Sequence, residues 1–293
     1  MIRLNIKQMI KNPLNLLWVI LLPLAWFIGT KYIRENVDLF LSFIADNNIS
    51  YEASKAIQEQ LDVVNGFMFF VEGASAFYLP FVIVLLVGII YSSAFIYDKN
   101  TGFGNFTITR TDYRKYFLSK IISIFAISFL SIFIILTGVF AYSLVKYSSQ
   151  LPTENFNFSM ILDSPTTKLF MSKPVLSCFI IVFTLSLFGA IYSLIGMGVS
   201  LFTSNRFLIS ISPLAIYLLS ILLPQLFSIQ SPISRYIAWV YPNYLTGFFI
   251  ENQFWYTNFS HFITYIIHFM VIIIPAVVMN ILLYTSNKRH YIK

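Results

Sequence analysis

The chain has 293 residues, of which 58% are hydrophobic and 11% are charged, and its mean hydropathy is +0.77. A soluble domain carries about 25% charged residues, so this composition excludes an ordinary water-soluble protein and indicates one surrounded mostly by lipid. The net charge of +7 does not indicate nucleic-acid binding, because the basic residues are scattered at the ends of apolar blocks rather than gathered in one domain.

The first residues predict an amphipathic helix at the membrane surface. Basic residues recur at every fourth position, namely Arg3, Lys7 and Lys11. Apolar side chains occupy the opposite side of such a helix, namely Ile2, Ile6, Met9 and Ile10. We therefore expect an interfacial helix whose basic face meets anionic headgroups.

Six apolar blocks follow, each about the length that crosses a hydrocarbon core of roughly 30 Å as a helix. They span residues 14–30, 77–97, 121–145, 175–201, 207–227 and 262–284. The first block lacks a small-residue cleavage motif, so we interpret it as a retained helix. A β-barrel would need shorter strands with alternating polarity. The sequence therefore predicts an all-α integral membrane protein, a single domain over residues 1–293 with six transmembrane helices.

The distribution of lysine and arginine predicts the orientation. Twelve of the 19 basic residues are Arg206 and those that lie before the first block, in the 98–120 segment or in the C-terminal tail. The other seven lie in the opposite loops, and positive residues favour the cytoplasmic side. Both termini are therefore expected in the cytoplasm, with the acidic 31–76 loop outside.

The 98–120 segment between spans two and three combines charges, a glycine turn and a short polar helix directly before span three. Such a helix on the membrane face can dock into a cleft of a soluble partner. We predict as coupling residues Asp98, Lys99, Arg110, Tyr113, Arg114, Lys115 and Tyr116. The tyrosines would fill the apolar floor of the cleft. The alternative is a solvated loop that only obeys the positive-inside rule.

The segment from residue 228 to 261 is too interrupted to cross as one helix but is dense in aromatic residues. Such residues favour the headgroup level, so we expect short re-entrant or interfacial helices between spans five and six. Trp239, Tyr241 and Tyr244 are candidates for an outer-leaflet gate or exit path. A passive aromatic belt is the alternative interpretation.

Enzymatic function is disfavoured, because no Gly-x-Ser-x-Gly, no His-Glu-x-x-His and no paired carboxylates at a membrane boundary occur. The single cysteine, Cys178, excludes an intramolecular disulfide and a cysteine metal cluster. Secondary transport is disfavoured because the apolar blocks contain no lysine, arginine or carboxylate, and His268 alone is a weak proton relay. The chain also lacks Gly-x4-Gly-Lys-Ser/Thr, so ATP would need a partner chain.

In their order along the chain, four short motifs resemble the ABC type-2 transporter permease family. Lys11–Pro13 before the first span is similar to that family's amphipathic start, and Tyr97–Gly102 to its aromatic-acidic signature after the second helix. The stretch from Arg114 to Lys120 falls where members carry a basic coupling segment, and Tyr241–Tyr244 resembles the stretch before the last helix. Asn100 departs from the signature, which has a second acidic residue at this position.

The resemblance implies a non-enzymatic permease subunit of a bacterial exporter in the cytoplasmic membrane. It would pair with a second permease copy or a related permease and with two cytosolic ATPase subunits, which would bind ATP and magnesium; this chain would bind no cofactor. An aromatic and aliphatic lining favours an antimicrobial peptide, a lipid or a hydrophobic drug as substrate. The alternatives are a non-transporting membrane sensor or assembly factor and, third, a secondary transporter.

Overall fold

The computed structural model describes residues 2–28, 31, 78–146, 173–226 and 261–291. These residues are almost entirely helical, and they contain no strand. In chain order the elements are α1 (Ile2–Ile10), η1 (Pro13–Asn15), α5 (Tyr78–Val87), the π-helical turn η2 (Gly88–Ser92), α6 (Ala94–Asn100), α7 (Phe103–Arg110), α8 (Tyr113–Lys146), α10 (Pro174–Val199), α11 (Arg206–Leu226) and α14 (His261–Tyr291).

Three helical segments of the described residues are long and apolar enough to cross a membrane, namely Leu79–Asn100, Tyr113–Tyr142 and Cys178–Val199. A fourth is possible if Ile2–Ile10 and Pro13–Ile28, which are bent by 67°, act as one broken span. Shorter apolar helices cover Arg206–Leu219 and Ile272–Lys288. The prediction of an all-α protein with membrane-spanning helices is therefore confirmed at the level of three to four such helices.

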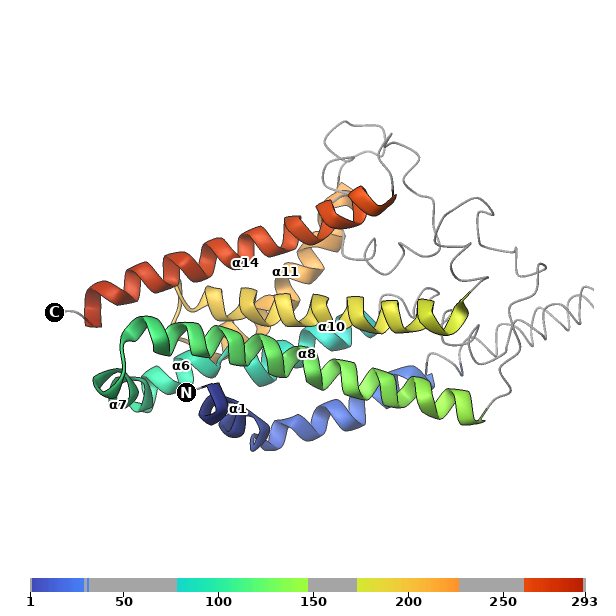
Figure 1. The fold of residues 1–293 in the computed structure, drawn as a ribbon. Helices are drawn as coiled ribbons and strands as arrows, with labels where there is room; N and C mark the ends of the chain where they lie inside the picture. Colours follow the sequence, from blue (N-terminus) through green and yellow to red (C-terminus); the bar gives the residue numbers. More distant parts are fainter. Residues whose placement is uncertain (1, 29–30, 32–77, 147–172, 227–260, 292–293) are drawn as a thin grey trace, which may run out of the picture.

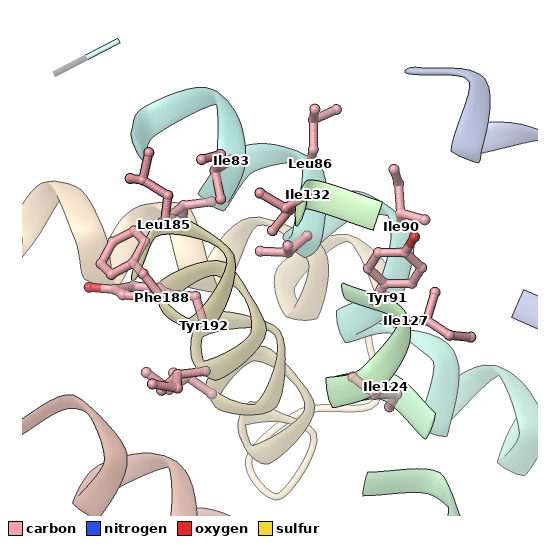
Figure 2. Close-up of a cluster of buried hydrophobic side chains, with 14 of the residues drawn as sticks. Ile83, Leu86, Ile90, Tyr91, Ile124, Ile127, Ile132, Leu185, Phe188 and Tyr192 are labelled. Carbon is pink, nitrogen blue, oxygen red and sulfur yellow. The ribbon is translucent and has the colours of Figure 1, made fainter. Parts of the chain in front are cut away.

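Helix α10 is the centre of the bundle. It packs against α8, α14, α11, α5 and η2 (Figure 1). Figure 2 shows part of the core, where Ile83 from α5, Ile132 from α8 and Phe188 from α10 are buried. An aliphatic and aromatic interior of this kind holds the helices by close packing, because lipid provides no hydrophobic drive between them.

Small residues on α10 allow this close approach. A Cβ atom on Gly189 would lie 2.7 Å from Ile83 Cγ2, and one on Gly196 would lie 2.7 Å from Pro213 Cγ. Ser193, between them, is fully buried. Real Cβ atoms do not approach other atoms so closely, so only glycine fits at both positions. This strip therefore serves packing between helices of one chain.

The N-terminal helix is amphipathic as predicted, but its buried face differs from the predicted one. Arg3, Lys7 and Lys11 are exposed. Ile2 and Ile10 are exposed as well, whereas Asn5 and Met9 are buried. The physical reason is that α1 packs along α8, where the amide Nδ2 of Asn5 donates to Ser119 Oγ at 3.1 Å. A helical-wheel argument alone does not anticipate this polar contact.

Hydrogen bonds among Asn15, Tyr91 and Ser131 connect the N-terminal segment to η2 and α8. Asn15 Nδ2 donates to the carbonyl of Met9 at 2.6 Å, which gives a partner to a carbonyl in the last turn of α1. Asn15 Oδ1 accepts from the Tyr91 hydroxyl at 2.9 Å. The same hydroxyl lies 2.8 Å from Ser131 Oγ on α8. The sharp bend after α1 is thus hydrogen-bonded directly to Tyr91 of η2 and, through the Tyr91 hydroxyl, connected to α8.

Candidate functional site

The candidate site is the coupling segment of residues 98–120, at the end of the bundle where α1, α7 and the C-terminal end of α14 lie (Figure 1). Helix α6 ends at Asn100, and Gly102, with φ of +72°, reverses the chain into α7. Glycine reaches this left-handed conformation without strain. Thr111 is extended, and Asp112 then begins α8 by accepting the backbone N–H of Arg114 through Oδ1 at 3.4 Å.

A buried ion pair closes this segment. Lys120 Nζ lies 2.7 Å from Asp98 Oδ2, and the exposed fractions of the two side chains are 1% and 0%. The Tyr116 hydroxyl donates to the same carboxylate oxygen at 3.1 Å. Removing one partner of a buried pair leaves an uncompensated charge and is strongly destabilising. The end of α6 is therefore held firmly against the beginning of α8.

Helix α7 is packed onto this pair. A Cβ atom on Gly104 would lie 3.3 Å from the Tyr116 hydroxyl oxygen and 3.5 Å from the Asp98 carbonyl oxygen, so α7 packs closely against both residues. We call α6, α7 and the first two turns of α8 the coupling bracket. Buried side-chain contacts connect its three parts.

The coupling bracket is also joined to α11 and α14. Lys99 Nζ donates to Asn287 Oδ1 at 3.4 Å, and the rings of Tyr113 and Tyr284 stack with centroids 5.4 Å apart. The guanidinium of Arg206, at the start of α11, lies 4.7 Å above the Tyr97 ring. A force on the bracket would therefore reach two other helices of the bundle.

The outer surface of the bracket is basic and partly aromatic. Lys99, Arg110 and Lys115 are exposed. Tyr97 is 45% exposed and Phe106 is 54% exposed, and the Arg110 guanidinium lies 4.1 Å above the Phe106 ring. These two rings border a shallow depression of about 440 Å³, which Gln8 and residues 101–103 also line. We call this area the end surface.

All seven predicted coupling residues lie on this bracket, but the two predicted aromatic anchors are buried within the protein. The exposed fractions of Tyr113 and Tyr116 are 4% and 2%. They pack inside the protein against Tyr284 and Asp98 because α8 begins at Tyr113 and turns both rings toward the bundle. Asp98, on α6, is buried against Tyr116 and Lys120 of α8. Trp239, Tyr241 and Tyr244, the predicted outer gate, and the re-entrant helices lie outside the described residues.

The sequence interpretation did not assign a role to the Asp98–Lys120 pair or to Phe106. The pair could have been predicted from the positions of its residues in the sequence. Asp98 directly follows the second apolar block, and Lys120 directly precedes the third. The end of one span and the start of the next lie on the same side of the membrane, so opposite charges at these two positions lie at a similar membrane depth. Nothing in the sequence distinguishes Phe106 from the other phenylalanines.

No family profile, no curated protein and no solved structure matches this chain. Among the described residues, no group of three or more histidine, cysteine or acidic side chains is placed to hold a metal ion. The site instead combines buried polar contacts with a basic and aromatic outer surface.

Proposed function

We propose that this chain is the transmembrane permease subunit of an ATP-driven exporter, similar to the ABC type-2 permeases. The proposal includes six spans, cytoplasmic termini, re-entrant helices before the last span and a location in a bacterial cytoplasmic membrane. Two cytosolic ATPase subunits bind ATP and magnesium, and a second permease copy or a related permease completes the translocation path. The substrate is an amphipathic or hydrophobic compound, such as an antimicrobial peptide, a lipid or a drug.

The observation that carries the proposal is the coupling bracket at one end of a bundle of apolar helices. A motor that acts from outside the membrane needs a stiff element on the membrane protein, because a flexible loop would absorb the movement. The buried contacts among Asp98, Tyr116 and Lys120 supply this stiffness. The contacts of Lys99 and Tyr113 with α14 supply a path from the bracket to the bundle.

The end surface supplies the contact chemistry. Exposed ion pairs contribute only about 0 to 1 kcal/mol each, whereas a buried aromatic anchor can contribute about 2 kcal/mol or more to a protein interface. Tyr97 and Phe106 are the exposed aromatic side chains of the described bracket, and basic residues surround them. We assign the anchor role to these two rings and an orienting role to Arg110 and Lys115.

The test is purification of the tagged full-length chain in mild detergent from its own host, followed by identification and quantification of copurifying polypeptides. We expect an ATPase with a Gly-x4-Gly-Lys-Ser/Thr motif at a fixed ratio to the permease. The double variant Tyr97→Ala with Phe106→Ala should lose about 2 kcal/mol or more of binding, which corresponds to roughly 30-fold weaker association.

Tyr142→Ala is the matched control. This tyrosine is 56% exposed near the opposite end of α8, so its removal should not change ATPase recovery. Absence of any such ATPase from the wild-type preparation would contradict the exporter proposal and favour a sensor or assembly factor. Full ATPase recovery with the Tyr97 and Phe106 double variant would contradict the assignment of the end surface.

A further inference from the structure

A second feature of the molecule is the outer face of α1. Arg3, Lys7 and Lys11 are exposed and recur at every fourth position, so they form one stripe along α1 and the residue that follows it. Leu4 and Ile10, which border the stripe, are 55% and 63% exposed. We call these five residues the basic face. Basic and aliphatic side chains arranged in this way are typical of helices that lie in a membrane interface.

The three cations of the basic face have no counter-charge nearby in the described part of the chain. Helix α1 contains no acidic residue. The described residues include two acidic side chains, Asp98 and Asp112. Asp98 is buried with Lys120, and Asp112 accepts from the backbone at the start of α8. The basic face is therefore complementary to an anionic partner from outside the chain.

The composition of the basic face favours lipid over a protein partner. Protein interfaces are enriched in aromatic residues and arginine and are depleted in lysine. Helix α1 has no aromatic residue, and two of the three cations are lysines, whereas the end surface has Tyr97 and Phe106. Lysines beside exposed aliphatic side chains are suited to anionic phospholipids, because the aliphatic groups enter the acyl boundary while the ammonium groups reach the phosphates.

The angle of α1 agrees with this partner. Ile2–Ile10 is bent by 67° from Pro13–Ile28, which runs in the long direction of the bundle (Figure 1). Asn15 Nδ2 holds the bend by donating to the carbonyls of Met9 at 2.6 Å and Ile10 at 3.0 Å. If Pro13–Ile28 crosses the membrane, α1 lies closer to the membrane plane than to its normal. The basic face then follows the headgroup layer over its whole length.

The inner face of α1 is attached to the coupling bracket. Asn5 is 2% exposed, and its Nδ2 donates to Ser119 Oγ at 3.1 Å. Ser119 Oγ in turn donates to the carbonyl of Tyr116 at 2.8 Å. Lys120, the next residue along α8, forms the buried pair with Asp98. Helix α1 therefore has the basic face on one side and the buried polar contacts of the bracket on the other.

We propose that α1 binds the anionic phospholipids of the surrounding membrane through the basic face, and that this binding stabilises the coupling bracket through Asn5. The three cations bind lipid phosphates, and Leu4 and Ile10 enter the acyl boundary. A ligand that binds the folded arrangement shifts the equilibrium toward it, so anionic lipid holds α1 against the start of α8. The attachment to the bracket makes the lipid a regulator of this segment. The proposal does not depend on the exporter proposal.

The first test measures which lipid lies beside α1. A bimane fluorophore is attached to Leu4→Cys in a Cys178→Ala background, and the purified full-length chain is placed in nanodiscs of equal parts phosphatidylglycerol and phosphatidylcholine. One of the two lipids carries brominated acyl chains, which quench bimane on contact. A cation near an anionic surface contributes about fivefold in affinity, so brominated phosphatidylglycerol should quench several-fold more than brominated phosphatidylcholine. Replacement of Arg3, Lys7 and Lys11 by glutamine should remove this difference.

A label at Asn105→Cys is the matched control. Asn105 is exposed on α7 at the same end of the bundle but lies outside the basic face, so both brominated lipids should quench its label weakly and equally. Strong but equal quenching of the Leu4 label by the two lipids would overturn the proposal, because the lipid beside α1 would not be selected by charge. Weak quenching by both would also overturn it and would assign the basic face to a soluble protein partner.

The second test measures whether lipid binding reaches the bracket. We expect the wild-type chain to denature at a higher temperature in nanodiscs with phosphatidylglycerol than in phosphatidylcholine alone, and the triple glutamine variant to lose this difference. Asn5→Ala and Ser119→Ala each remove the contact between α1 and α8. Both should keep the lipid preference at the Leu4 label and lose most of the temperature difference. A full temperature difference in both variants, or none in the wild type, would overturn the stabilisation of the bracket.

Discussion

Lys120 Nζ and Asp98 Oδ2 are 2.7 Å apart and lie in a fully buried position that joins the end of α6 to the beginning of α8. The carboxylate also accepts from the Tyr116 hydroxyl, while its second oxygen, Oδ1, has no partner among the described residues. Among the described residues, each of the two charges therefore has the other as its ion-pair partner. The pair makes a short, rigid connection between two candidate membrane spans.

Single substitutions in this pair should destabilise the protein more than replacement of the whole pair. Lys120→Met leaves a buried carboxylate and Asp98→Leu leaves a buried ammonium, and each should cost about 3 to 5 kcal/mol. The double variant, with apolar side chains at both positions, should recover much of this loss. Thermal denaturation of the detergent-purified variants, followed by size-exclusion chromatography, measures the difference. A double variant whose loss equals the sum of the single losses would contradict the direct coupling of the two residues.

Glycine positions on the helices should differ sharply in their tolerance of alanine. Gly196→Ala would place a Cβ atom 2.7 Å from Pro213 Cγ and close to Ser92, so α10 must separate from η2 and α11. We expect a loss of roughly 1 to 3 kcal/mol and a lower denaturation temperature. Gly138→Ala is the control, because no atom lies within 4 Å of its added Cβ and alanine favours helix. Equal stability of the two variants would show that α10 is not packed as described.

Removal of the buried tyrosines should reduce stability rather than uncouple a folded protein. Tyr113→Ala deletes a ring stacked on Tyr284, and Tyr116→Ala deletes both a core ring and a hydrogen bond to Asp98. Truncation of a buried aromatic side chain costs about 3 to 5 kcal/mol, so each variant should show lower yield and a lower denaturation temperature. If the variants kept wild-type stability but lost ATPase binding, the two tyrosines would instead belong to the partner interface.

The two ends of the bundle should face opposite sides of the membrane. Asn105, on α7, and Lys173, just before α10, are both exposed, and they lie beyond opposite ends of α8 and α10. In a Cys178→Ala background, Lys173→Cys should react with a membrane-impermeant thiol reagent on intact cells. Asn105→Cys should react only after permeabilisation. The reverse labelling pattern would invert the orientation that the basic residues predict.

The sequence predicted the helices well because their cause is local. Apolar blocks at 121–145 and 175–201 correspond to α8 (Tyr113–Lys146) and α10 (Pro174–Val199), since a membrane segment must satisfy its own backbone as a helix. The block at 77–97 is helical too, although the π-helical turn η2 interrupts it where Gly88 allows α11 to approach. No pattern within the block indicates that interruption, because it depends on a neighbouring helix.

The candidate site was less predictable, since its geometry depends on tertiary contacts. The 98–120 segment contains a turn at Gly102, as its glycine indicated. However, the predicted polar helix is continuous with α8, and this continuity turns Tyr113 and Tyr116 inward. A tyrosine side chain has an apolar ring and a polar hydroxyl, so it can lie either in a buried core or on an exposed surface. Tertiary contact between α6 and α8 buries Asp98 and Lys120. The exposure of Phe106 depends on how α7 packs.

The most direct test of the exporter proposal is site-specific photocrosslinking from the end surface in living cells. A benzophenone amino acid at Asn105, which is exposed on α7 between the two aromatic anchors in sequence, should crosslink to an ATPase that contains a P-loop. The same amino acid at Tyr142, near the far end of α8, should not. Mass spectrometry of the crosslinked products identifies the partner. Abundant, correctly inserted protein that yields no ATPase adduct at Asn105, or the same adduct at both positions, would contradict the account.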